Sequence, residues 1–114
     1  MTRVDKPWGH ELIWAATDRY VGKMLFVRAG EALSLQYHRV KDETIMVVSG
    51  RLSFTHFAEG EPPETRELAP NEPFHITPGL RHRMVALEDC HIVEVSTPEL
   101  EDVVRLEDRY GRVK

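Results

Sequence analysis

The chain alternates apolar and polar residues in short runs and shows no sustained helical spacing before residue 98. Between Arg51 and Ala58, for example, Leu52, Phe54 and His56 alternate with polar residues. Because successive side chains of a β-strand point to opposite faces, this period of two predicts a half-buried strand. The same reasoning predicts strands at residues 11–15, 20–28, 33–38, 44–49, 65–68, 74–77, 82–87 and 91–96. We expect the first of these at the edge of a sheet.

Glycine and proline residues mark the connections between these strands. Ser49-Gly50 is a tight hairpin signal, and the acidic, proline-rich run 59–64 is expected to be an exposed loop. The stretch 99–114 follows a Thr-Pro pair and is expected to form a short helix or a tail, with Asp102 and Arg105 on its solvated face. Many short strands with this single candidate helix are typical of an all-β sandwich or barrel.

Composition and charge narrow the class of protein. A chain of 114 residues is long enough for one hydrophobic core and too short for two, so we expect residues 1–114 to form a single domain. The formal charge of −4 and the lack of long basic clusters argue against nucleic-acid binding. The first residues do not resemble a signal peptide, and no apolar run approaches the roughly 20 residues of a membrane span. With Cys90 as the only cysteine, these features predict a cytoplasmic protein that does not bind membranes.

Candidate metal ligands gather in the stretch 30–50. Gln36 and His38 are two residues apart on one predicted strand, so their side chains share a face. After a short turn, Glu43 opens the next strand, and a hairpin would return its carboxylate to the same place. An amide oxygen, an imidazole and a carboxylate are three of the four ligands that a metal site commonly needs. His82 is the candidate for the fourth.

These residues form part of a spacing motif. The motif reads Gly30-x5-Gln36-x-His38-x4-Glu43-x6-Gly50 and is followed by Thr77-Pro-Gly-Leu-Arg-His82. It resembles the paired motifs of the cupin superfamily, although Gln36 stands where the commonest pattern has a histidine. Further matching segments are Lys6-Pro-Trp-Gly9, Leu33-Ser-Leu-Gln36, Val47-Val-Ser-Gly50 and Val104-Arg-Leu-Glu-Asp-Arg-Tyr-Gly-Arg112. Together they are similar to the C-terminal isomerase domain of type II mannose-6-phosphate isomerases, over residues 6–112.

The resemblance implies a fold, a metal and a reaction. The fold would be a small double-stranded β-helix, which is a jelly-roll or cupin barrel, and the metal would be held by Gln36, His38, Glu43 and His82. We expect zinc first, with manganese, iron and nickel as alternatives. The reaction would be the aldose–ketose isomerisation of a sugar phosphate. The guanylyltransferase domain that commonly precedes such a domain is not among these 114 residues, so nucleotidyl transfer is not implied.

Isomerisation needs an electrophile for the substrate oxygen and a base for the carbon-bound proton. The metal would supply the first, and Glu94 is our candidate for the base, with His56 and His75 as alternatives. Lys23 and Lys41 are the expected phosphate contacts, because strand parity places them at the same mouth. Lys41 stands where the family has an arginine, and a lysine lacks the planar two-pronged donor that suits phosphate.

Whether the protein is an enzyme is left open by the sequence. Two alternatives remain beside an isomerase: a metal-dependent oxygenase on the same barrel, which usually has more histidine ligands, and a carbohydrate-binding cupin without turnover. All three functions require a small-molecule ligand. For the isomerase and the carbohydrate-binding cupin that ligand is a sugar or sugar phosphate. We also expect a homodimer, since exposed edge strands of small barrels are commonly covered by a partner.

Overall fold

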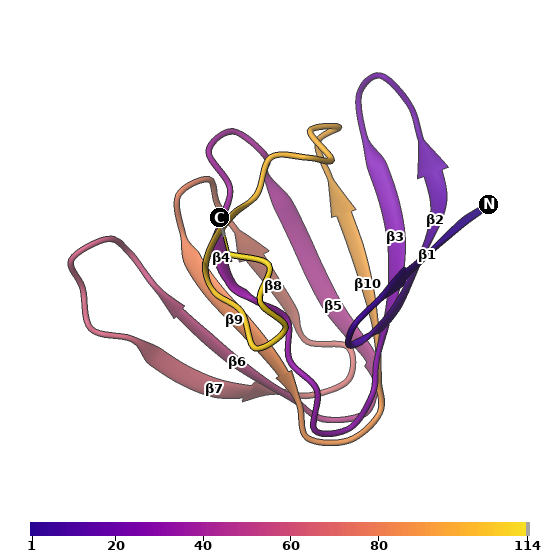
Figure 1. Cartoon of the computed structure of the whole chain (residues 1–114). Helices are drawn as coiled ribbons and strands as arrows, with labels where there is room; N and C mark the ends of the chain where they lie inside the picture. Colours follow the sequence, from indigo (N-terminus) through magenta and orange to yellow (C-terminus); the bar gives the residue numbers. More distant parts are fainter. Residues whose placement is uncertain (114) are drawn as a thin grey trace.

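The computed structural model describes residues 1–113 and shows two antiparallel β-sheets that curve around a common interior (Figure 1). The first sheet contains, in spatial order, β1 (Thr2–Lys6), β2 (Gly9–Ala16), β3 (Val21–Val27), β10 (Cys90–Ser96), β5 (Glu43–Ser49) and β8 (Pro73–Ile76). The second contains β11 (Val104–Glu107), β4 (Leu35–Tyr37), β9 (Arg81–Ala86), β6 (Leu52–Phe57) and β7 (Glu64–Leu68). The all-β fold predicted from the alternating pattern is confirmed.

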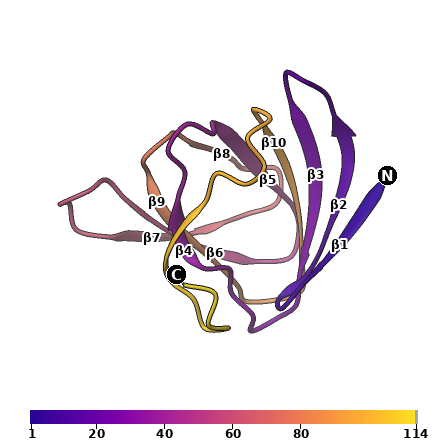
Figure 2. The same ribbon diagram turned by 45° about the horizontal axis from the view of Figure 1, so that its top comes forward.

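The hydrophobic core lies between the two sheets. Figure 2 shows the two sheets with the top of the molecule brought forward. Alternation along each strand builds this core. In β3, Leu25 and Val27 are buried on the same face as Lys23, as the pattern predicted. In β6, Leu52 and Phe54 point inward against Met84 of β9. Fully burying one such side chain stabilises the fold by about 1.5–3 kcal/mol, so these strands contribute much of its stability.

The turn predicted at Ser49-Gly50 is present, but the hairpin is wrong, because β5 and β6, which the turn joins, lie in different sheets and do not pair with each other. Gly50 has a φ of 93°, a left-handed conformation that suits glycine. A Cβ atom at this position would lie 2.2 Å from the carbonyl oxygen of Asp89. Both the turn and the close approach of the loop between β9 and β10 therefore require a residue without a side chain.

Residues 11–15 form a strand, but the prediction that this strand lies at a sheet edge is wrong. β1 pairs with β2 along its outer side, with Val4 opposite Glu11. The sequence pattern missed β1 because Val4 is its only apolar residue. Val4 and Lys6 are half-buried toward the interior, whereas Arg3 and Asp5 are exposed and form an ion pair at 3.0 Å.

Of the two alternatives expected for residues 99–114, a short helix or a tail, the helix is excluded over residues 99–113, and Lys114 lies outside the described residues. Residues 98–103 form turns, and β11 then pairs antiparallel with β4. The reason is the carboxylate of Asp102, which accepts hydrogen bonds from the backbone amides of Arg39, Val40 and Lys41. These contacts fix the segment on the sheet. Within residues 1–113 no helix is long and apolar enough to cross a membrane.

Candidate metal centre

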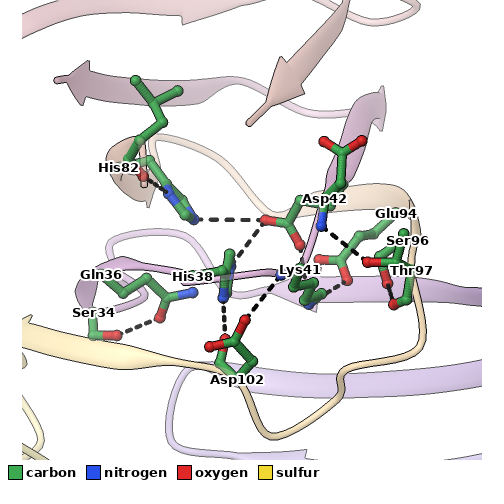
Figure 3. Close-up of polar contacts among 12 residues, drawn as sticks. Ser34, Gln36, His38, Lys41, Asp42, His82, Glu94, Ser96, Thr97 and Asp102 are labelled. Atoms are coloured by element: carbon green, nitrogen blue, oxygen red, sulfur yellow. Dashed lines mark hydrogen bonds and ion pairs between the residues drawn. The ribbon is translucent and has the colours of Figure 1, made fainter. Parts of the chain in front are cut away.

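Three buried side chains meet where the two sheets approach each other. His38 directly follows β4 and His82 lies on β9 (Figure 3). Glu43 begins β5. One ligand atom from each lies within 4.8 Å of the others. The exposed fractions of the three residues are 3%, 3% and 1%. Two strands of one sheet and one strand of the other therefore bring two imidazoles and a carboxylate to one point.

The outer nitrogen of each imidazole fixes its tautomer. His38 Nδ1 lies 2.5 Å from the carbonyl oxygen of Asp102, and His82 Nδ1 lies 3.0 Å from that of Leu80. A carbonyl oxygen can only accept, so each Nδ1 carries the hydrogen and each Nε2 presents a lone pair. Both Nε2 atoms are buried without a hydrogen-bond partner among the described residues. They lie 3.3 Å and 3.6 Å from Glu43 Oε1.

This arrangement fits a cation. Two lone pairs directed at a carboxylate oxygen repel it unless a positive charge lies between them. Burial lowers the pKa of His82, which keeps its imidazole neutral. Burial alone would raise the pKa of Glu43, but the contact with His38 and the charge of the Lys41 ammonium outweigh burial and lower the pKa to about 2. A carboxylate and two neutral imidazoles are donors that divalent metals prefer.

Gln36 is brought to the same site. It lies directly opposite His82 in the β4–β9 pair, so the two side chains share a face. Its Oε1 accepts a hydrogen bond from Ser34 Oγ, which places the amide nitrogen beside His38 in Figure 3. A half-turn of the amide exchanges its oxygen and nitrogen, and the Ser34 hydroxyl can accept as well as donate. In that orientation Gln36 would present its Oε1 beside His38 as a fourth donor atom.

Lys41 connects the cluster of His38, Glu43 and His82 to Glu94. Its Nζ lies 3.0 Å from Glu43 Oε2 and 3.3 Å from Glu94 Oε2, and both residues are buried. Burial would lower the pKa of Lys41, but the carboxylates of Glu94 and Glu43 outweigh it and raise the pKa. Burial also raises the pKa of Glu94, helped by the charge of Glu43. Lys41 is therefore a charged bridge between the two carboxylates.

A cavity of about 330 Å³ opens from this cluster. Lys23 lines it opposite Glu94 in the β3–β10 pair, and its Nζ lies 3.3 Å from Glu11 Oε1. The cavity walls also include Trp8, Leu25, Leu33, Met84, Leu100 and Val103. All three residues expected to act on substrate, Lys23, Lys41 and Glu94, thus line one cavity, and both ammonium groups already face carboxylates.

The other two candidates for the base lie elsewhere. His75 is exposed on β8 and its Nε2 lies 2.7 Å from Asp42 Oδ1. His56 stacks on Phe54 and contacts Phe74, with ring centroids 5.8 Å and 4.8 Å away. Neither lines the cavity. Both therefore have packing and surface contacts rather than access to a ligand.

Sequence reasoning missed two residues of this site. Asp102 holds the loop that carries Lys41, and Arg105 lines the cavity from β11. Both were expected on the solvated face of a helix. No local pattern marks them, because their positions follow from pairing with residues more than 60 positions earlier.

Comparison with known proteins agrees with this geometry. The family model described as "Mannose-6-phosphate isomerase C-terminal" matches residues 1–108. The mannose-1-phosphate guanylyltransferase ManC of Salmonella typhimurium is 36% identical over 115 residues, which cover 96% of this chain and 23% of that protein. The xanthan biosynthesis protein XanB of Xanthomonas campestris is 34% identical over 115 residues, which cover 96% of this chain and 24% of that protein. The chain therefore spans about a quarter of the length of these relatives.

Solved structures show the same fold. The capsular polysaccharide assembling protein CapF of Staphylococcus aureus superposes with a TM-score of 0.77 at 20% identity, over 94% of this chain and 32% of that one. The oxalate decarboxylase of Bacillus subtilis, which has Mn(II) centres, gives a TM-score of 0.79 at 17% identity, over 93% of this chain and 30% of that one. These likenesses confirm the cupin jelly-roll fold. The protein belongs to the family of mannose-6-phosphate isomerase C-terminal domains.

Proposed function

We propose that this protein is a divalent-metal-dependent cupin that interconverts the aldose and ketose forms of a sugar phosphate. The observation that carries the proposal is the pair of buried Nε2 lone pairs, on His38 and His82, directed at the Glu43 carboxylate beside a cavity. Zinc is the first expected metal, and manganese, iron and nickel suit the same donors. The family match supports mannose 6-phosphate as the first substrate to test.

The reaction rearranges protons without a further reactant. One proton moves from carbon 2 to carbon 1, and one moves from the hydroxyl oxygen on carbon 2 to the carbonyl oxygen on carbon 1. A metal held by Gln36, His38, Glu43 and His82 would supply the Lewis acid that polarises the substrate oxygens. The protein must then provide a group that takes up and returns the carbon-bound proton.

Glu94 is our proposal for that group. Its carboxylate is buried on β10 and lines the same cavity as His38 and Glu43. Lys41 orients it by an ion pair at 3.3 Å. Because only 6% of Glu94 is exposed to solvent, a proton held on its carboxylate would return to the substrate rather than exchange.

The cavity suits a small polar ligand. Its volume of about 330 Å³ is at the lower end of the range for small-molecule sites. Its wall combines apolar side chains with paired charges, which fits a sugar that offers both ring faces and hydroxyl groups. We also propose that residues 1–114 form a single domain, since the described strands share one core.

The test replaces Glu94 with its neutral isostere. Metal-loaded wild type should convert mannose 6-phosphate to fructose 6-phosphate, measured by a coupled assay. Glu94→Gln should keep its metal, measured by elemental analysis, and lose about 100-fold or more in kcat. His75→Gln, on the outer surface, is the matched control and should keep full activity. Full turnover by Glu94→Gln would exclude it as the base, and no turnover by the loaded wild type would exclude the isomerase.

A carbohydrate-binding cupin without turnover is the second candidate. The observation that favours it is the ion pair between Lys41 and Glu94, which neutralises the carboxylate proposed as the base. In this case the metal and sugar would bind and the sugar would be released unchanged. Calorimetric binding of mannose 6-phosphate by metal-loaded protein that shows no turnover would support it.

A further inference from the structure

Arg105 stands out among the cations around the cavity. Its Nε atom is buried and has no hydrogen-bond partner among residues 1–113. No carboxylate in that part of the chain forms an ion pair with its guanidinium group. Arg105 as a whole is half-buried, so its buried Nε is the part that needs an explanation. A buried donor without a partner is costly, and a water, an ion or a ligand group bound at that place is one way to satisfy it.

The position of Arg105 directs it toward the proposed reaction centre. Arg105 lies opposite Gln36 in the antiparallel pair of β11 and β4, and directly opposed side chains share a face. The register shifts immediately afterwards at Leu106, a bulge of the kind that redirects strands beside binding sites. Arg105 therefore points to the same interior as Gln36.

Arg105 also lies where two cavities join. It lines both the inner cavity and a more open groove of about 630 Å³. Three other charged residues also line both spaces: Lys6, Arg112 and the exposed acid Glu101. Arg39 lines the groove and not the inner cavity. A ligand that reaches from the inner cavity into the groove must pass this guanidinium group.

The other cations are less available for an anion. Lys23 and Lys41 face carboxylates at 3.3 Å and 3.0 Å. Arg112 binds Asp108 with two nitrogens, at 2.9 Å and 3.0 Å. Lys6 is half-buried at the end of β1, and no ion pair to it is found within residues 1–113. Arg105 and Lys6 are thus the two inward cations with capacity for a new anionic partner.

We propose that Arg105, assisted by Lys6, binds the phosphate group of the substrate where the inner cavity meets the groove. The planar guanidinium group offers parallel N–H donors that match phosphate oxygens in a bidentate geometry. Lys23 and Lys41 then hold Glu11, Glu43 and Glu94 instead of the phosphate. The sugar phosphate as ligand rests on the proposed function, and it would lie with its phosphate in the mouth and its carbonyl end toward His38, Glu43 and His82.

The test measures binding of inorganic phosphate to chelator-treated protein, so that no metal competes for the anion. Isothermal titration calorimetry compares wild type with Arg105→Gln, and with Arg83→Gln as the matched control. Arg83 is on β9 and pairs with Glu107 at 3.4 Å, away from the cavity. We expect Arg105→Gln to weaken phosphate binding roughly 10- to 100-fold. Arg83→Gln should bind like wild type, and Arg105→Lys should be intermediate.

Lys6→Gln is a second variant for the case that Arg105→Gln does not fold. Lys6 is half-buried on an edge strand, where a substitution disturbs the core less, and Lys6→Gln should weaken phosphate binding several-fold. Equal phosphate affinity in wild type and in the folded Arg105→Gln or Lys6→Gln variant would overturn the proposal, as would a wild type that binds no phosphate. The proposed function fails separately. If the loaded wild type shows no turnover while phosphate binding still depends on Arg105, the phosphate site stands and isomerisation does not.

Discussion

His82 illustrates how a single residue combines several requirements of the site. Its ring is buried, its Nδ1 donates to the Leu80 carbonyl, and its pKa is lowered by burial. The side chain therefore offers a neutral nitrogen with a fixed direction. His56 on β6 occupies the directly opposed position, but it packs between Phe54 and Phe74 and is not part of the ligand cluster. Neighbouring contacts thus decide which of two paired histidines can be a ligand.

We predict that His82→Ala removes the metal. Loss of an outer contact to a ligand commonly costs about 10- to 100-fold in metal affinity, so loss of the ligand itself should cost about 100-fold or more. Elemental analysis of protein purified without an affinity tag would show stoichiometric metal in wild type and little in the variant. His75→Ala should retain it. Equal metal in wild type and His82→Ala would contradict the four-ligand site.

Among the elements, the segment before β11 holds two parts of the site in place. The Asp102 carboxylate accepts three backbone amides of the loop 39–41, at 3.1, 2.7 and 2.9 Å. Its main-chain oxygen accepts from His38 Nδ1. Asp102 alone thus holds both the loop that carries Lys41 and the proposed metal ligand His38.

We predict that Asp102→Ala destabilises the protein by about 2 kcal/mol in urea unfolding at pH 7, because three loop amides lose a charged acceptor. These amides lower the pKa of Asp102 from 3.8 to about 2. Its contribution is therefore fully present above pH 3.8 and is lost as the pH falls through about 2. Wild type should lose more stability than Asp102→Asn in that window. Asp18→Asn, in an exposed loop, is the control, and identical acid profiles for all three proteins would refute the prediction.

At the scale of the whole molecule, the sheets leave edges that a second copy could cover. β1 is the outer strand of the six-stranded sheet, and most of its side chains are exposed. An uncovered edge strand offers unpaired backbone groups to another chain. The homodimer expected from the sequence remains a prediction, and β1 is where we place its contact.

We predict that light scattering coupled to size-exclusion chromatography gives the mass of a dimer for wild type. A variant that lacks residues 1–5 should have the mass of a monomer, because the deletion removes most of β1 and with it the side chains and backbone groups that we expect to contact the second copy. Arg3→Ser, which removes only an exposed ion pair, is the control and should stay dimeric. A monomeric wild type, or a dimeric truncated protein, would show that β1 does not form the contact.

The parts of this molecule that were predictable are those set by local pattern. Leu52 and Phe54 alternate within one strand, and Gly50 marks its turn, so the strand could be predicted from a few residues. The motif that carries His38 and Glu43 is also local in sequence, although the hairpin expected there is wrong: β4 and β5 lie in different sheets, and their connection brings the two side chains together across the interior. By contrast, the ion pair of Lys41 with Glu94 joins residues 53 positions apart, and nothing local marks it.

The helix predicted for the C-terminal stretch was wrong for the same reason. Val103, Val104 and Leu106 are compatible with a helix face, and only the contacts of Asp102 and the pairing of Arg105 with Gln36 select a strand. Those contacts depend on a sheet that is already in place. Tertiary pairing thus overrides local preference at the residues nearest to the proposed site.

The late position of β11 has a consequence for the order of assembly during synthesis. The chain leaves the ribosome from its N-terminus, so His38, Glu43 and His82 emerge before the segment that contacts them. The barrel strands up to β10 can pair while the Asp102 carbonyl and Arg105 are still inside the exit tunnel. Competence to hold metal and anion would then be acquired only after residues 98–112 emerge, so a nascent chain would carry the barrel before it carries the finished site.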